Sequence, residues 1–469
     1  MSAESNASRT EAPLTPTAVS CPAKVLVAGG YLVLDRNYTG LVFGLDARIH
    51  CVVEPIKSTS GVTISEIVVK SPQFRDAIWE YGYRAKENDS GMTVHTLSVG
   101  HNQVISRNPF IETALTYALT YIWSLTPNRI LAPASIRILA DQAYYSNPGT
   151  SKSASSRFLD FGVSLKEAHK TGLGSSAALV TSFTGAVLSF YLPTSLFDIS
   201  SPRGQTILHN LAQASHSHAQ GKVGSGFDIA SAVFGSCLYK RFSPSLLSDL
   251  PAPGQANFGS RLRTLVEGTW DTEIAQAAIK MPSGLRLVMC DVDCGSETPG
   301  MVKKVLAWRE ANKTEAEGIW QRLQGGNEAL AKELTRLAEE GAEEPDGAGR
   351  YAKLSVIIEE NRVAIRDMGV QSGVPIEPPQ QTALLDYCTK IEGVVGGVVP
   401  GAGGFDAIVL LVENDEDVLS GLRQKLSEYK PDDVVAEGPK IGRVGTVDVR
   451  EEMVGVKREE LGLYKEWTD

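Results

Sequence analysis

A glycine- and serine-rich segment, Lys170-Thr171-Gly172-Leu173-Gly174-Ser175-Ser176-Ala177-Ala178, constrains this chain more than any other stretch, and it runs straight into the apolar residues Leu179 to Leu192. Glycines let backbone N–H groups approach an anion closely, and a helix beginning at the small residues would point its positive dipole end at that anion. The two hydroxyls add ligands for phosphate oxygens or Mg²⁺. The pattern predicts a cradle for a nucleoside triphosphate, although it lacks the Gly-Lys-Ser/Thr ending of a P-loop. A simple tight turn before a buried helix is the alternative.

Composition and charge exclude several classes of protein. The 469 residues, 42% of them hydrophobic, can bury a large core and predict two domains. A net charge of −10 argues against a nucleic-acid or anionic membrane surface. No apolar run approaches the ~18 residues that span a bilayer. Residues 1–18 are expected to be a disordered tail, and the six scattered cysteines indicate free thiols in the cytoplasm.

The hydrophobic pattern mixes strands and helices without strict alternation, which favours an α+β fold. A domain boundary is expected between Trp270 and Leu285, which gives an N-terminal domain over 19–275 and a C-terminal domain over 276–469. Loops are expected at 141–156, 243–259 and 343–349. Strands are expected at 25–28, 47–54, 62–70, 135–140, 236–240, 285–292 and 407–412, and helices at 110–125, 205–220, 229–235, 301–313, 315–340 and 352–369.

Three more glycine-marked segments accompany the cradle: SCPAKVLVAGGY at 20–31, GKVGSGFDIA at 221–230 and PGAGGFDA at 400–407. In this order and spacing, the four segments resemble those of the GHMP kinase superfamily, named for galactokinase, homoserine kinase, mevalonate kinase and phosphomevalonate kinase. His169-Lys170-Thr171 stands where mevalonate kinases usually carry Pro-Gly-Ala, and Asp406 follows the last glycines. In these features the chain is similar to the fungal-type phosphomevalonate kinases.

The resemblance implies a two-domain GHMP kinase fold. An N-terminal ribosomal protein S5 domain 2-like domain and a C-terminal ferredoxin-like domain would enclose the active site in the cleft between them. It also implies the transfer of phosphate from ATP, with Mg²⁺, to 5-phosphomevalonate in the mevalonate pathway of isoprenoid and sterol synthesis. The expected partners are these small molecules, with no nucleic acid and no membrane, for a cytoplasmic monomer or homodimer.

The same resemblance assigns roles to individual residues. Lys24 would touch the transferring phosphate or the acceptor, and Asp228 is similar to the catalytic aspartate of the superfamily. ATP would bind Lys170, Gly172, Leu173, Gly174, Ser175, Ser176 and Ala177, with Ser176 as a Mg²⁺ ligand. The acceptor would meet Lys24, Tyr31, Tyr145, Ser146, Lys222, Ser225, Gly403 and Asp406.

Several of these assignments have a structural alternative. Lys24 is also compatible with a strand end whose ammonium reaches solvent, and Asp228 with the N-cap of a helix that starts near Ile229. Lys222 and Asp406 are also compatible with ordinary charged loop residues.

The chain departs from the mevalonate kinase pattern at the second metal ligand. That branch has a glutamate upstream of the aspartate, whereas here His216 and His218 occupy the region and no glutamate lies between Gln205 and Asp228. The second ligand is therefore left open, and the histidines are expected to be structural or to contact substrate. Two rival functions remain: another GHMP kinase such as mevalonate kinase, and a non-catalytic ligand sensor. A sensor would be expected to lose Lys24, Asp228 or the serine pair.

Overall fold

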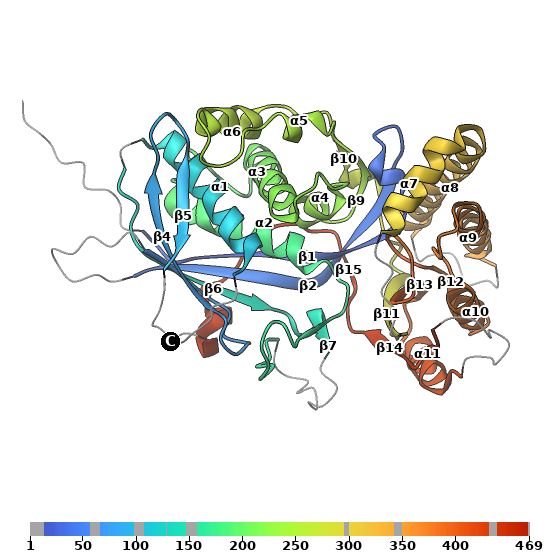
Figure 1. The fold of residues 1–469 in the computed structure, drawn as a ribbon. Coiled ribbons are helices and arrows are strands. Elements are labelled where there is room, and N and C mark those ends of the chain that lie inside the picture. The colour runs from blue at the N-terminus through green and yellow to red at the C-terminus, as the bar shows by residue number, and fades with distance from the viewer. Residues whose placement is uncertain are drawn as a thin grey trace, which may run out of the picture.

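Two large β-sheets with helices packed against them make up the described part of the chain. The computed structural model describes residues 14–56, 66–97, 107–127, 129–146, 157–294, 300–341, 349–430 and 439–467. Within these ranges the first sheet has ten strands, the second has four, and β7 (Tyr145–Ser146) pairs with β8 (His169–Lys170). Figure 1 shows the first sheet beneath its helices, with the second sheet beyond one end of it.

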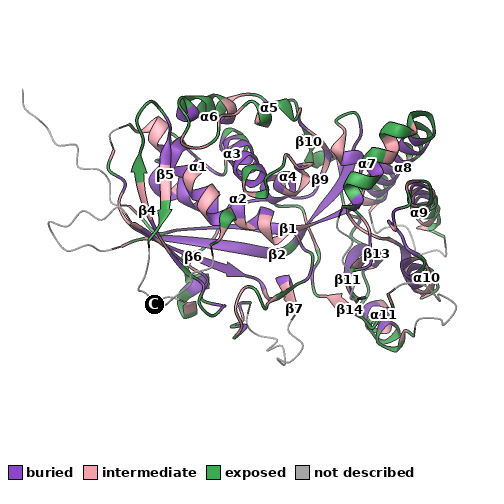
Figure 2. Ribbon diagram, in the orientation of Figure 1, coloured by how far each residue is buried: buried purple, intermediate pink, exposed green. Residues whose placement is uncertain are grey.

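The first sheet is built around two long strands, β1 (Thr17–Ala28) and β2 (Gly40–Pro55), which run antiparallel. Both are buried along most of their length (Figure 2). Their pairing shifts register after Pro22, a residue that has no N–H to donate. The other strands are β3 (Glu66–Lys70), β4 (Ile78–Ala85), β5 (Met92–Thr96), β6 (Ala134–Ala140), β9 (Cys237–Lys240), β10 (Glu273–Ala275), β15 (Glu451–Glu452) and β16 (Lys457–Arg458).

Helices cover one face of this sheet. α2 (Ser175–Tyr191) lies directly on β1 and β2, and its side chains are buried nearly all round, as expected of a core helix. It ends at Leu192, just before Pro193. The neighbouring helices are α1 (Pro109–Leu125), α3 (Pro202–Gln220), α4 (Phe227–Phe234), α5 (Ser245–Ser248) and α6 (Phe258–Glu267).

The second sheet is antiparallel, in the order β12–β13–β11–β14, and the chain visits it in the βαββαβ sequence of a ferredoxin-like domain. Successive residues of β11 face opposite sides: Leu287 and Met289 join the core of the first sheet, whereas Val288 and Cys290 join a second core. The two sheets therefore share apolar packing. The elements are β11 (Leu285–Asp293), α7 (Met301–Ala311), α8 (Lys313–Glu340), α9 (Ala352–Ser372), α10 (Pro379–Cys388), β12 (Val394–Val398), β13 (Ala407–Glu413), α11 (Glu416–Glu428) and β14 (Arg443–Val447).

After β14 the chain returns to the first sheet. β15 pairs with β2 and β16 pairs with β1. The short helix η4 (Leu461–Trp467) then places Tyr464 against Ala18 and Val52, on the face of the sheet opposite α2. Arg48, which is 1% exposed, donates to the carbonyls of Val454 and Gly455 and so fastens this segment to β2.

Three expectations from the sequence are corrected by these elements. The boundary of the predicted tail at residue 18 is wrong because β1 begins at Thr17 and Ala18 is buried, while residues 1–13 lie outside the described chain. The predicted C-terminal unit, 276–469, is wrong in its last part because β15 and β16 belong to the first sheet. The stretch 243–259 is not only a loop, since it holds α5 and the start of α6.

The remaining strands and helices expected from the sequence occur at or near their predicted positions within the described residues, which confirms the α+β class. Of the expected loops at 141–156 and 343–349, residues 147–156 and 343–348 lie outside the described residues, whereas 141–146 hold the short helix η2 (Gln142–Tyr144) and β7. Among the helices described, none combines the length and the apolar character needed to cross a bilayer.

Candidate active site

The predicted phosphate cradle forms the N-terminus of α2. Gly174 is the N-cap residue and adopts the left-handed conformation, with φ at 80°. Because glycine supplies no capping side chain, the first-turn N–H groups face outward as donors for an anion. Ser175 and Ser176 are partly exposed beside them. The Leu173 carbonyl accepts a hydrogen bond of 3.1 Å from the Lys24 N–H, which fixes the cradle to β1.

Lys24 lies across this helix terminus. A Cβ on Gly174 would come within 2.6 Å of Lys24 Cε and 3.3 Å of Lys24 Nζ, so only glycine leaves room for the lysine. The ammonium lies 5.6 Å from the centre of the Phe227 ring. Burial lowers the pKa of Lys24, and the nearby negative charge of Asp228 acts in the opposite direction. Lys24 lies inside β1, so the strand-end alternative is wrong.

Asp228 lies in the first turn of α4, where the helix dipole favours a negative charge. The N-cap is Gly226, so the alternative of Asp228 as the capping residue is wrong. Its Oδ1 accepts a hydrogen bond of 3.0 Å from the Ile229 N–H. Its Oδ2 lies 3.9 Å from His216 Nδ1. The two predicted catalytic residues thus come from different elements, β1 and α4, and Asp228 lies beside His216.

His216, on α3, stands between the cradle and Asp228. Its Nε2 lies 3.1 Å from Ser176 Oγ and 3.2 Å from the Gln220 amide nitrogen. Burial lowers the pKa of His216, while Asp228 raises it and Lys222 lowers it. The residue is only 2% exposed, which places it behind the site rather than in it.

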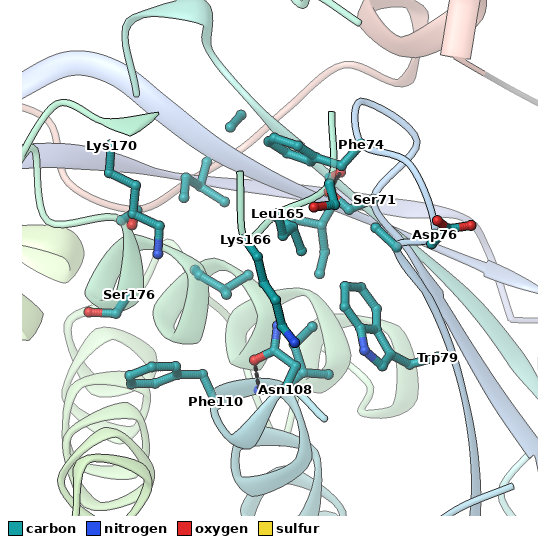
Figure 3. A pocket seen from close by; sticks show the side chains of 18 of the residues that line it. Ser71, Phe74, Asp76, Trp79, Asn108, Phe110, Leu165, Lys166, Lys170 and Ser176 are labelled. Atoms are coloured by element: carbon teal, nitrogen blue, oxygen red, sulfur yellow. Dashed lines mark hydrogen bonds between the residues drawn. The ribbon is translucent and has the colours of Figure 1, made fainter. Parts of the chain in front are cut away.

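A pocket of about 380 Å³ opens beside the cradle and is lined by Lys170, Ser175 and Ser176 at one end. Figure 3 shows Phe74, Trp79 and Phe110 around the rest of the space, with Lys166 reaching into it. Aromatic walls next to lysines suit a flat base joined to phosphates. Sequence reasoning missed this pocket because its residues come from the β3–β4 connection, the start of α1 and residues 164–166, which carry no common motif.

The fourth glycine segment meets the end of β1. Gly401 N–H donates to the Leu26 carbonyl at 3.1 Å, and a Cβ on Gly30 would lie 2.3 Å from the Gly401 carbonyl oxygen. Tyr31 has a positive φ of 67°, which is unusual for this residue type, and its hydroxyl donates to the Ala402 carbonyl at 2.6 Å. Because Tyr31 is 3% exposed, it supports the glycine segment from behind.

Comparison with known proteins identifies the family of this chain. A model of the GHMP kinases N terminal domain matches residues 152–236, which include the cradle, His216 and Asp228. Phosphomevalonate kinase of Gibberella zeae is 49% identical over 96% of this chain and 98% of its own, and that of Aspergillus fumigatus is 45% identical over 97% and 99%. The chain belongs to the phosphomevalonate kinase family.

A crystal structure of Streptococcus pneumoniae phosphomevalonate kinase with phosphomevalonate and AMPPNP covers 92% of the chain at 17% identity, with a TM-score of 0.55, and confirms the two-domain GHMP kinase fold.

The surroundings of two of the residues predicted to bind acceptor can be described. Tyr145 lines the pocket beside the cradle, with its ring 4.9 Å from that of Phe74. Asp406 is exposed, and its carbonyl accepts a hydrogen bond of 2.9 Å from the Val292 N–H, which places it by the end of β11. The side chain of Ser146 lies outside the described part of the chain.

Lys222 and Ser225 lie in the connection between α3 and α4, next to Asp228 in sequence. Lys222 is exposed, and its ammonium is close enough to His216 to lower the pKa of that ring. The Ser225 carbonyl accepts from the Tyr239 hydroxyl at 2.7 Å. Arg241, which sequence reasoning missed, donates to the carbonyls of Val223 and Gly224 and to that of Leu34. It therefore joins this connection to the segment after Tyr31.

The protein side chains near the cradle suit Mg²⁺ only if phosphate oxygens and water supply most of the ligands of the metal ion. The described residues contain no group of three or more His, Cys, Asp or Glu side chains that could hold a metal ion. Ser176 Oγ is partly exposed at the cradle, and a hydroxyl that donates to His216 keeps its lone pairs for a cation. Mg²⁺ commonly keeps several waters and binds through substrate phosphates, so this site fits it.

Proposed function

We propose that this protein transfers the γ-phosphoryl group of ATP to 5-phosphomevalonate, giving 5-diphosphomevalonate and ADP in the mevalonate pathway. The observation that carries the proposal is the position of Lys24, whose side chain lies over the open N-terminus of α2. The charge of Asp228 is close enough to act on the Lys24 ammonium. Phosphoryl transfer depends on positioning and on neutralising charge, and this arrangement provides both. Membership of the phosphomevalonate kinase family supports the choice of acceptor.

On the nucleotide side, the backbone N–H groups of the cradle would hold the triphosphate, with Lys170 beside them. The base would occupy the aromatic pocket lined by Phe74, Trp79 and Phe110. Ser176 would contribute one ligand to Mg²⁺, which neutralises phosphate charge when bound. The cradle residues in this role are Gly172, Leu173, Gly174, Ser175, Ser176 and Ala177.

On the acceptor side, Lys24 would attract both the acceptor phosphate and the charge that develops on the transferred group. The second pKa of a phosphate monoester is about 6, so at pH 8 nearly all of the acceptor is already a dianion. Asp228 therefore acts by orienting the acceptor and Lys24 rather than by removing a proton. Lys222, Ser225 and Gly403 would border the acceptor, while Tyr31 supports the glycine segment behind it.

The reaction is assigned to the cytoplasm, in a monomer or homodimer. All six cysteines are buried and unpaired, as is usual in a reducing compartment. Cell fractionation and light scattering test these two assignments.

A coupled assay of ADP release tests the acceptor. With purified protein, kcat/KM for 5-phosphomevalonate should exceed that for mevalonate by at least about 100-fold, because loss of a charge-assisted phosphate contact is costly. Equal turnover of both acceptors would contradict the assignment and favour a broader GHMP kinase. ATP binding without turnover of either acceptor would favour a ligand sensor.

A further inference from the structure

His216 links the two halves of the proposed site through one ring. On one side, Nε2 lies 3.1 Å from the hydroxyl of Ser176, the residue proposed to bind Mg²⁺. On the other side, Nδ1 lies 3.9 Å from the Asp228 carboxylate, whose charge acts on Lys24. The ring belongs to α3, whereas Ser176 is on α2 and Asp228 is on α4. One buried side chain therefore spans the three helices that build the site.

The hydrogen-bond partners determine the tautomer of this ring. Nε2 faces a hydroxyl and, at 3.2 Å, the amide nitrogen of Gln220. An amide nitrogen can only donate, so Nε2 must accept and the ring hydrogen is on Nδ1, towards Asp228. The Ser176 hydroxyl then donates to His216, and its oxygen lone pairs are left for a cation.

The distance of 3.9 Å to Asp228 is longer than a hydrogen bond. Hydrogen bonds at catalytic sites are often long without substrate and shorten in the complex. A small movement of α4 towards α3 would close the contact, so the carboxylate and the serine would be aligned by the same ring.

We propose that His216 is a positioning residue that orients the Ser176 hydroxyl and the Asp228 carboxylate together, so that the nucleotide-metal half and the acceptor half of the site are aligned. The proposal rests on the proposed function of this site. His216 does not touch substrate, since it is 2% exposed behind Ser176. The deletion of its ring nitrogens should change metal dependence and turnover more than it changes acceptor affinity.

The test compares His216→Leu with His209→Leu. Both histidines are on α3 and both are 2% exposed, but His209 bonds to Asn210 and lies against Phe234 and Trp270, away from the cradle. Calorimetry without acceptor should show that His216→Leu weakens ATP binding by about 10-fold at low Mg²⁺, with much of the loss recovered at high Mg²⁺. In the complete reaction, its kcat should fall by about 10–100-fold, with the acceptor KM within about 3-fold of wild type.

Two further variants separate positioning from packing. His216→Gln places an amide oxygen near the position of Nε2, so it should restore the Mg²⁺ dependence of ATP binding. Adding His216→Leu to Ser176→Ala should cause little further change in that dependence, because the two residues act through one contact. Equal losses of thermal stability in the two leucine variants, with unchanged kcat and Mg²⁺ dependence, would overturn the proposal.

An NMR measurement on the His216 ring of the wild-type protein tests the proposal even if the leucine variants fail to fold. In ¹⁵N NMR spectra, His216 Nε2 should be unprotonated and Nδ1 protonated, and Ser176→Ala should shift Nε2 selectively. A protonated Nε2 would contradict the proposal. If wild type fails to phosphorylate 5-phosphomevalonate while His216→Leu still alters Mg²⁺-dependent ATP binding, the proposed acceptor is wrong and the positioning role stands.

Discussion

Gly174 and Gly172 share a backbone conformation but have different neighbours. Their φ angles are 80° and 73°, in the left-handed region that glycine adopts without strain. A Cβ on Gly174 would lie 2.6 Å from Lys24 Cε, whereas one on Gly172 would meet no described atom within 4 Å. Glycine at 172 therefore serves the turn alone, while glycine at 174 also makes space for Lys24.

This difference gives a matched pair of variants. Gly174→Ala and Gly172→Ala should each lose about 1–2 kcal/mol of stability, because both place a side chain in the left-handed region. Only Gly174→Ala should displace Lys24, so its kcat should fall at least about 10-fold further than that of Gly172→Ala. Steady-state assays of both variants, with melting temperatures, measure the two effects separately. Equal kcat values would show that Lys24 does not need its position over the helix terminus.

At this scale, glycine patterns located Lys24, Asp228 and the cradle because each lies in a motif that is continuous in sequence. The place of Tyr145 in the aromatic pocket could not be predicted, because one residue in a two-residue strand gives no sign of which way it faces. The link from His216 to Ser176 joins residues forty positions apart, 3.1 Å from each other in the fold. Nothing in their spacing predicts that contact.

At the scale of elements, the acceptor side depends on loops held by one guanidinium. Arg241 follows β9 and donates to Leu34, the last residue of the short helix η1 (Leu32–Leu34), and to Val223 and Gly224, before α4. Its contacts at 2.6 Å and 2.7 Å go to backbone carbonyls of these two separate segments. The planar guanidinium of arginine can donate to both carbonyls at once, whereas lysine has a single ammonium group at the end of its chain.

Arg241→Lys should therefore loosen both loops. We expect the KM for 5-phosphomevalonate to rise at least about 5-fold while the KM for ATP changes little, since the cradle is fixed to β1 instead. The free energy of unfolding should fall by about 1–3 kcal/mol, because partly buried carbonyls lose their donors. Arg263→Lys is the control, as Arg263 is an exposed partner of Glu267. Equal increases in both KM values would show that Arg241 does not act on the acceptor side alone.

The long helices and strands could be predicted from the sequence, whereas the two-residue strands could not. α1 and β11 carry strong apolar periodicity over many residues, which reports burial directly. β15 and β16 have two residues each, too few for a pattern. β16 pairs with β1, and β15 pairs with Gly44 and Leu45 of β2, between the parts of β2 that pair with β9 and β6. The aromatic pocket is likewise a product of packing between elements that are distant in sequence.

At the scale of the whole molecule, buried histidines make stability depend on pH. Burial lowers the pKa of His209 to about 4 and also lowers the pKa values of His50 and His216. His209 therefore stays neutral in the folded protein, whereas the unfolded chain takes up a proton below its usual pKa of about 6.5. The contribution to stability is complete above that pH and is lost as the pH falls towards 4.

Urea unfolding of wild type and His209→Leu at pH 7 and pH 5 measures this contribution. The free energy of unfolding of wild type should fall by about 2 kcal/mol more than that of the variant between these pH values. His50 and His216 titrate in both proteins, so their effects cancel in the comparison. Parallel losses would mean that His209 takes up its proton in the folded state over the same pH range as in the unfolded chain.

The return of residues 451–467 to β1 and β2 has a consequence for synthesis on the ribosome. The ribosome translates Lys24, Asp228 and the whole cradle well before Val454 and Gly455. The carbonyls of these last two residues accept hydrogen bonds from the Arg48 guanidinium. If β1 and β2 packed before that segment emerged, the Arg48 guanidinium would be buried away from water without these two carbonyl partners. Such a state is costly in free energy. The nascent chain should therefore resist cooperative folding until the ribosome has released the segment, and chaperones would meet it with the first sheet unfinished.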